Sequence, residues 1–199
     1  MSDDRFVAFR LISVLVLAVI CLALPARADI KAGEKAYHRG DYTTALHEWE
    51  QLAKKGNAAA QYNLGLLYAN GQGVPKDDAQ ARQWYEKAAL QGHAEAQVSL
   101  GSLYDYGRGG PQDFRMAVRW YRRSADQGNE LAQRRLGLLY ERGDGVPKDY
   151  VQAYMWYKLG AASGGKTAVM MRDELAARMT SDQLVEAKKL AREWKPKGK

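Results

Sequence analysis

The chain has 199 residues, of which 46% are hydrophobic and 10% aromatic, with five prolines and one cysteine. This composition excludes a disordered chain, a collagen-like chain and a disulfide-stapled scaffold, because enough apolar surface is present to form a core. Lysine and arginine number 30 against 23 acidic residues, so the net charge of +7 is only mildly basic.

The first 28 residues have the composition of a secretory signal peptide. A polar, basic start precedes an apolar run at 11–24, and small residues at positions 26 and 28 close the segment. The run is shorter than the roughly 20 residues that a membrane-spanning helix needs. We therefore expect cleavage near Ala28, a periplasmic or secreted bacterial protein with no stable membrane span after cleavage, and no nucleic-acid partner. Cys21 is then removed, so the mature chain has no disulfide, and Ile20 before it argues against lipid attachment.

The dominant feature that follows is self-similarity with a step of 36 residues. A Leu-Gly pair, a tyrosine, a Gly-x-Gly element, a proline, an aspartate, a Trp-Tyr pair and a closing glycine all recur at this step. The step divides the chain into repeats at 57–92, 93–128 and 129–164.

Each repeat reads as two helices. In the first repeat, Gln61, Leu64 and Tyr68 are spaced by three and four, which places them on one helical face. A wider apolar stripe of the same period surrounds Trp84 and Tyr85. One such hairpin cannot offset the conformational entropy of its own chain, so the hairpins must stack. The predicted fold is all-α: a short α-solenoid of stacked antiparallel helical hairpins.

The residues between the stripes predict where helices begin and end. An aspartate precedes the apolar stripe of the second helix in each repeat, where its carboxylate can accept the free N–H groups of that helix's first turn. A glycine follows each second stripe and can end the helix in a left-handed conformation. The Gly-x-Gly elements indicate a connecting loop and not a dinucleotide-binding turn, since a helix and not a strand comes before them. The aspartates are Asp77, Asp113 and Asp149, and the closing glycines are Gly92, Gly128 and Gly164.

The three repeats resemble the Sel-one-like repeat family, which is related to the tetratricopeptide repeats. The shared pattern is Ala-x-x-x-Leu-Gly-x-x-Tyr-x-x-Gly-x-Gly-Val-Pro-x-Asp, then Ala-x-x-Trp-Tyr-x-x-Ala-Ala-x-x-Gly. Residues 60–92 and 132–164 match it almost throughout, and the middle copy departs at Gly110 and Ser124. The resemblance implies a protein-binding adaptor or regulator. No enzymatic activity and no cofactor are expected, because the candidate motifs carry no strong chemical signal.

Residues 29–56 are expected to form a capping hairpin in front of the repeats. They resemble a tetratricopeptide unit whose first helix runs from near Asp29 to His38, with Gly40 at the turn. This hairpin would cover the first apolar face of the array.

Residues 165–199 break the period and are expected to cap the other end. Thr180 and Gln183 form a capping box in front of an amphipathic helix, which can cover the last apolar face. After that helix, a frayed basic tail is predicted from Lys195 onward.

No metal site and no catalytic residues are expected. His38, His47 and His93 are too scattered for metal-ligand spacing. Ser163 and Lys166 match the S-x-x-K spacing of penicillin-recognising serine enzymes, but the Ser-Asp-Asn and Lys-Thr-Gly elements are missing. A helix-ending loop is the favoured interpretation, and a β-lactamase-like hydrolase remains an alternative.

The repeated tryptophans Trp84, Trp120 and Trp156 leave a second alternative open. Such rings can stack on sugars, which would give a peptidoglycan- or glycan-binding protein. Their place in the apolar stripe favours burial in the core.

Partner-binding residues are expected where the repeats differ. In tetratricopeptide repeats the first helix of each hairpin lines the concave face, and the same arrangement here exposes positions beside the Leu-Gly core. Arginine is concentrated in the third repeat, so the expected partner is an acidic or amphipathic protein segment; a merely solvated face is the alternative. The predicted binding residues are Tyr62, Asn70, Ser102, Tyr106, Arg134 and Arg142, with Leu66, Val98 and Leu138 beside them.

Overall fold

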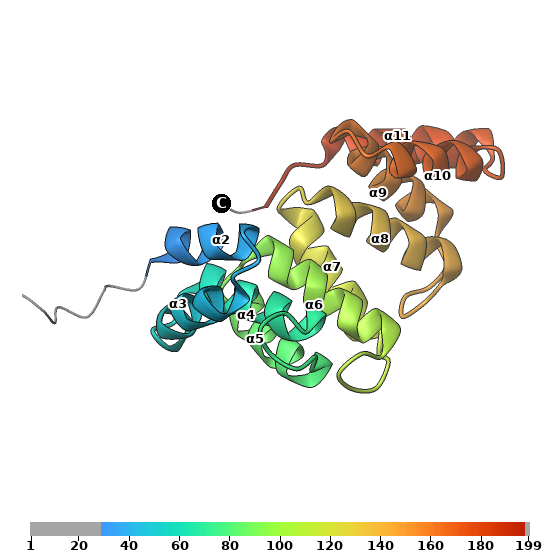
Figure 1. Ribbon diagram of the computed structural model, residues 1–199. Coiled ribbons are helices and arrows are strands. Elements are labelled where there is room, and N and C mark those ends of the chain that lie inside the picture. The colour runs from blue at the N-terminus through green and yellow to red at the C-terminus, as the bar shows by residue number, and fades with distance from the viewer. Residues whose placement is uncertain (1–28, 198–199) are drawn as a thin grey trace, which may run out of the picture.

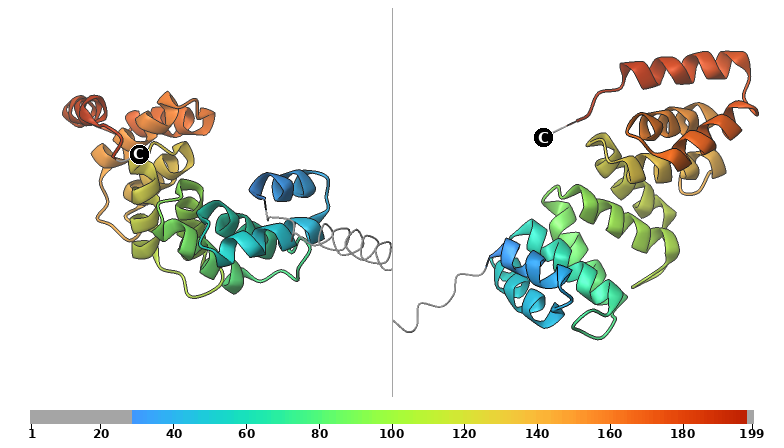
Figure 2. Two further views of the ribbon diagram at one scale, coloured as in Figure 1. Left: turned by 90° about the vertical axis from the view of Figure 1, so that its left-hand side faces the viewer. Right: turned by 45° about the horizontal axis from the view of Figure 1, so that its top comes forward.

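The computed structural model describes residues 29–197, so the predicted signal peptide lies outside the described residues. This part of the chain contains ten α-helices and no β-strand, which confirms the all-α prediction. The helices stack in chain order into a curved array, with α2 at one end and α10 and α11 at the other (Figures 1 and 2). They are α2 (Ile30–His38), α3 (Tyr42–Lys54), α4 (Ala58–Asn70), α5 (Asp78–Leu90), α6 (Ala94–Tyr106), α7 (Phe114–Asp126), α8 (Glu130–Arg142), α9 (Tyr150–Ala162), α10 (Lys166–Ala176) and α11 (Ser181–Glu193).

Helices begin and end at the residues that the sequence indicates. The carboxylate of Asp77 accepts two backbone N–H groups in the first turn of α5, both at 2.9 Å. Asp113 and Asp149 cap α7 and α9 by accepting one backbone N–H group each. Gly92 follows the C-cap of α5 with φ of +90°, a left-handed conformation that glycine adopts without strain. The capping predictions for the repeats are therefore confirmed.

The glycine of each Leu-Gly pair lets the two helices of a hairpin approach closely. A Cβ atom added at Gly101 of α6 would lie 2.8 Å from the ring of Tyr121 on α7, which is closer than real Cβ atoms come to a neighbour. The tyrosine ring therefore fills the space that a larger residue would need. The equivalent pairs are Gly65 with Tyr85 and Gly137 with Tyr157.

The Gly-x-Gly loops pack against the preceding repeat. A Cβ at Gly109 would lie 2.3 Å from the backbone oxygen of Asp78, and one at Gly145 would lie 2.5 Å from the backbone of Phe114. Arg108, between the two glycines of its loop, donates two hydrogen bonds to the Asp78 carboxylate, at 2.6 and 3.0 Å. The Arg108 guanidinium lowers the pKa of Asp78. These loops are therefore inter-repeat contacts, as the connecting-loop interpretation requires.

Two of the three repeated tryptophans lie in the core. Trp156 is 1% exposed and Trp120 is 5% exposed. Trp84 is only half-buried, which corrects the expectation of burial in every copy. Its ring packs at the edge of a hydrophobic cluster near the N-terminal end of the array, which includes Trp49 and Leu64. The Lys87 ammonium lies 4.1 Å from the centre of the Trp84 ring.

The C-terminal cap departs from the hairpin plan. Both α10 and α11 pack against α9, and they share few contacts with each other. The capping box of Thr180 and Gln183 is present at the start of α11, as predicted. The residues after α11 are not frayed at this point: the backbone N–H of Lys197 donates to the carbonyl of Asp126 at 2.7 Å. The prediction of a frayed tail from Lys195 is therefore wrong for residues 195–197.

Candidate binding face

The first helices of the three repeats, α4, α6 and α8, carry the predicted binding residues, and we call their outward-facing positions the first-helix face. Tyr106 is 54% exposed at the end of α6, and Asn70 and Arg142 are exposed at the ends of α4 and α8. Ser102 and Arg134 are half-buried near the middle of their helices. The exposed members of the set thus lie at the C-terminal ends of the three helices.

Tyr62 joins two repeats and is not a free surface residue. Its ring stacks on His93 with centres 4.8 Å apart and lies 5.8 Å from the ring of Tyr85. Burial raises the pKa of Tyr62. Val98, which the sequence places on the exposed face, is 8% exposed and belongs to the core, so that expectation is wrong.

An arginine and a tyrosine connect the second and third repeats on this face. The Arg135 guanidinium donates a hydrogen bond of 2.5 Å to the hydroxyl of Tyr106 and lies 5.4 Å from its ring centre. The two side chains therefore fix each other's position, and Tyr106 remains more than half exposed. Asn70 is held in a comparable way, because its side-chain amide donates to Gln72 at 3.3 Å.

Two carboxylates beneath the face are bonded to tyrosines of the second helices. Asp105 is 8% exposed and accepts from the hydroxyl of Tyr121 at 3.2 Å, and burial raises its pKa. Glu141, one repeat later, accepts from Tyr157 at 2.8 Å and from Arg178 at 2.5 Å. Both carboxylates are engaged within the chain, so they compensate little of the arginine charge at the surface.

A row of glutamines runs along the opposite ends of the helices, and sequence reasoning missed it. Gln61, Gln97 and Gln133 each donate to a backbone carbonyl eight residues earlier, at 3.1 to 3.3 Å. Gln91 and Gln127, the C-caps of α5 and α7, donate to the side-chain oxygens of Gln61 and Gln97. The signal was available, because these glutamines follow the step of 36 residues.

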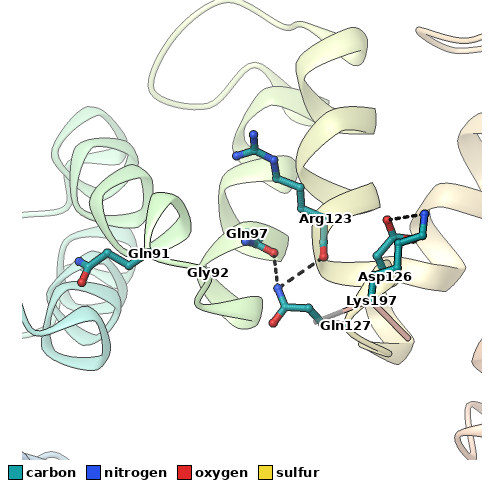
Figure 3. Close-up of a pocket in the computed structure, with 7 residues that line it drawn as sticks. All are labelled: Gln91, Gly92, Gln97, Arg123, Asp126, Gln127 and Lys197. Carbon is teal, nitrogen blue, oxygen red and sulfur yellow. Dashed lines mark hydrogen bonds and ion pairs between the residues drawn. The ribbon is translucent and has the colours of Figure 1, made fainter. Parts of the chain in front are cut away.

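A polar pocket of about 470 Å³ lies beside this glutamine row (Figure 3). It is formed by the ends of α5 and α7, the start of α6 and the segment after α11. Gln127 bridges the pocket wall by donating to Gln97 and to the backbone oxygen of Arg123, and Lys197 reaches Asp126 on the other side. The pocket is shallow and has no cluster of groups suited to acid–base chemistry.

Among the described residues no hydrogen bond joins Ser163 and Lys166, the pair that matches the S-x-x-K spacing. Ser163 is the C-cap of α9, and its hydroxyl lies 3.5 Å from the carbonyl of Leu159. Lys166 is exposed at the first residue of α10, so the two side chains are on different helices. Residues 29–197 contain no group of three or more histidine, cysteine or carboxylate side chains that could hold a metal. No helix in the same range is long and apolar enough to cross a membrane.

Solved structures with similar folds are repeat proteins. A Sel1 repeat protein from Oxalobacter formigenes superposes with a TM-score of 0.71 and 30% identity, over 90% of this chain and 79% of that one. The antigen c5321 of uropathogenic Escherichia coli, described as having an SLR fold, superposes with a TM-score of 0.50 and 29% identity, over 77% of this chain and 41% of that one.

Sequence relatives share shorter stretches. An exopolysaccharide production negative regulator of Rhizobium leguminosarum bv. viciae is 29% identical over 99 residues, which are 42% of this chain and 37% of the relative. DAP3-binding cell death enhancer 1 of Rattus norvegicus is 39% identical over 49 residues, or 25% of this chain and 10% of the relative. The chain thus spans well under half the length of either curated relative.

The stacked hairpins and the inter-repeat loops define a helical-repeat protein of the α-solenoid class. The Sel1 repeat model matches residues 58–93, 94–129 and 131–165, which together make up more than half of the chain. The chain therefore belongs to the Sel1 repeat family, as the sequence pattern indicated.

Proposed function

We propose that this chain is an exported bacterial scaffold that binds an acidic protein segment on the first-helix face, at Tyr106, Arg135 and Arg142. Sel1 repeats typically mediate protein–protein interactions, and one sequence relative is a regulator. A scaffold or regulatory role needs a recognition surface and no catalytic group.

The exposed Tyr106, held against Arg135, is the observation that carries this proposal. Tyrosine and arginine are enriched among the residues that dominate binding energy at protein interfaces. The bond between them fixes both side chains in advance, which reduces the entropy lost on binding. Arg142 is exposed nearby on the face and forms no ion pair with another residue in 29–197, so its charge is available to a partner carboxylate.

Site-specific crosslinking in intact cells tests the binding face. A photoreactive residue at position 106 should crosslink a partner, and the same residue at the exposed position 119 on α7 should not. Arg142→Glu should then lower capture of that partner at least tenfold, while the matched reversal Arg115→Glu on α7 leaves it unchanged. Equal crosslinking from positions 106 and 119 would reject the assignment.

Two further measurements address the location and the glycan alternative. Cell fractionation should recover the chain, shortened near Ala28, outside the cytoplasm. Trp120 and Trp156 are buried and cannot stack on sugars, which weakens the case for a glycan ligand. Co-sedimentation with purified cell-wall sacculi, combined with no crosslinked protein, would favour the glycan alternative over the scaffold.

A further inference from the structure

The segment Trp194–Lys197, which we call the tail, returns from α11 to the middle of the array (Figure 1). Trp194 ends α11 in an extended conformation, with φ of −64° and ψ of 137°. Its ring contacts that of Trp156 edge-on, with centres 6.2 Å apart. Three residues later, Lys197 bonds to Asp126 at the end of α7. The tail thus links its own helix to a repeat that is distant in the sequence.

The C-terminal end of α7 binds Lys197 through a backbone hydrogen bond and an ion pair. The Lys197 N–H donates to the Asp126 carbonyl at 2.7 Å, and its ammonium lies 3.7 Å from the Asp126 carboxylate, whose side chain is 19% exposed. The C-terminal end of a helix favours a cation, because the helix dipole is negative there. Extended peptides bind to protein surfaces by this combination of main-chain hydrogen bonds and side-chain anchors.

The contact between Trp194 of the tail and Trp156 beneath it leaves both indole N–H groups without partners among the described residues. The indole N–H groups of Trp156 and Trp194 are buried and have no hydrogen-bond acceptor among residues 29–197. A buried donor without an acceptor is unfavourable. A competing segment that supplies an acceptor would therefore have an advantage over the tail.

The helix that carries the tail, α11, packs mainly against one neighbour, α9. Of the 13 residues of α11, Ala187 and Ala191 are buried, Leu184 and Leu190 are partly buried against the core, and Val185 is 65% exposed. The ion pair that α11 forms, between Lys189 and Glu186, is internal to the helix. Residues 195–197 are exposed and Trp194 is only partly buried, so the tail can leave its position while the buried residues of α11 stay on α9.

We propose that Trp156, Asp126 and the adjoining polar pocket form a second docking site, and that the tail occupies it as an internal competitor. The site takes an extended protein segment with an aromatic residue followed, three positions later, by a lysine. It is formed by the second helices α7 and α9, the end of α5 and the start of α6, and includes none of the residues proposed to bind on the first-helix face, so its existence does not depend on the proposed function.

A synthetic fluorescent peptide copying residues 192–197 tests the proposal by fluorescence anisotropy. The double variant Trp194→Ala, Lys197→Ala should bind this peptide at least tenfold more tightly than the unmodified chain, because a tethered segment competes at an effective concentration near millimolar. Lys195→Ala is the matched control, because Lys195 is exposed in the same segment, and it should behave as the unmodified chain. Adding Asp126→Asn to the double variant should weaken peptide binding at least tenfold.

Equal affinity for the double variant and the unmodified chain, or no binding to the double variant at millimolar peptide, would overturn the proposal. Hydrogen exchange on the unmodified chain gives a second measurement that needs no substitution. The amide of Lys197 should exchange slowly, and millimolar peptide should speed up its exchange if the peptide displaces the tail. Protection that persists under saturating peptide would contradict the competition.

Discussion

We expect Ser163→Gln to stabilise the fold by completing the row of glutamine hydrogen bonds. In the first two repeats a C-cap glutamine donates to the buried glutamine of the first helix, as Gln127 does to Gln97 at 2.8 Å. In the third repeat the C-cap is Ser163, and the side-chain oxygen of Gln133 is buried with no partner among the described residues. The backbone at Ser163 (φ −83°, ψ 5°) matches that at Gln127 (φ −83°, ψ −2°), so a glutamine there starts from the same geometry.

The size of the effect follows from two opposing terms. An unsatisfied buried acceptor costs about 1–3 kcal/mol, and ordering a glutamine side chain costs up to about 2 kcal/mol. The expected gain is therefore about 1 kcal/mol in the free energy of unfolding, which raises the Tm by about 2–4 °C in a domain of this size. Differential scanning calorimetry measures this shift. Gln127→Ser is the reverse change and should lower the Tm.

A double variant separates the hydrogen bond from other effects of a longer side chain. Gln133→Leu removes the acceptor, so Ser163→Gln should no longer raise the Tm in that background. The reasoning is refuted if Ser163→Gln leaves the Tm unchanged or lowers it, or if the rise persists without Gln133.

Two further predictions concern packing and pH. Gly101→Ala should lower the free energy of unfolding by about 1–3 kcal/mol, because the added methyl group meets the Tyr121 ring. This loss is expected despite a gain of about 1 kcal/mol in helix propensity. Unchanged stability in urea denaturation would contradict the prediction and mean that the ring moves aside. The Nδ1 atom of His93 accepts the N–H of Ala96 at 3.3 Å, and burial holds the pKa of His93 below 6.5, although Glu95 opposes the shift. The unfolded chain therefore binds more protons in the window below 6.5, and stability falls as the pH falls through it. His93→Asn keeps the cap and removes this contribution, so its stability should depend less on pH between about 5 and 7; equal slopes in urea titrations of both proteins would contradict the assignment.

The repeat architecture could be predicted because its signals are local and recur. Caps such as Asp77 act within one helical turn, and the Leu-Gly pairs and the tyrosines of the Trp-Tyr pairs mark the same core positions three times. Each local preference agrees with the global fold, which is the condition under which sequence patterns determine structure. The stacking was predicted because one hairpin alone cannot offset the conformational entropy of its chain.

The binding face and the C-terminal end could be predicted only in part. The spacing placed Val98 on an exposed face, but the position is covered when adjacent hairpins pack together. The engagement of Tyr62 with His93 joins neighbouring repeats and cannot be read from either repeat alone. The tail was missed because Trp194 and Lys197 meet residues far away in the sequence, where no periodic signal exists.

The packing of α10 and α11 on α9 has a consequence for how such a protein changes length. The helices α10 and α11 each pack on α9 and hardly on each other, so this end does not repeat the paired surface on which the hairpins stack. A 36-residue unit inserted between 128 and 129 would instead meet neighbours of the kind that each repeat already has. Gene-level duplication can thus lengthen the first-helix face from within, while the helices at the two ends stay unchanged.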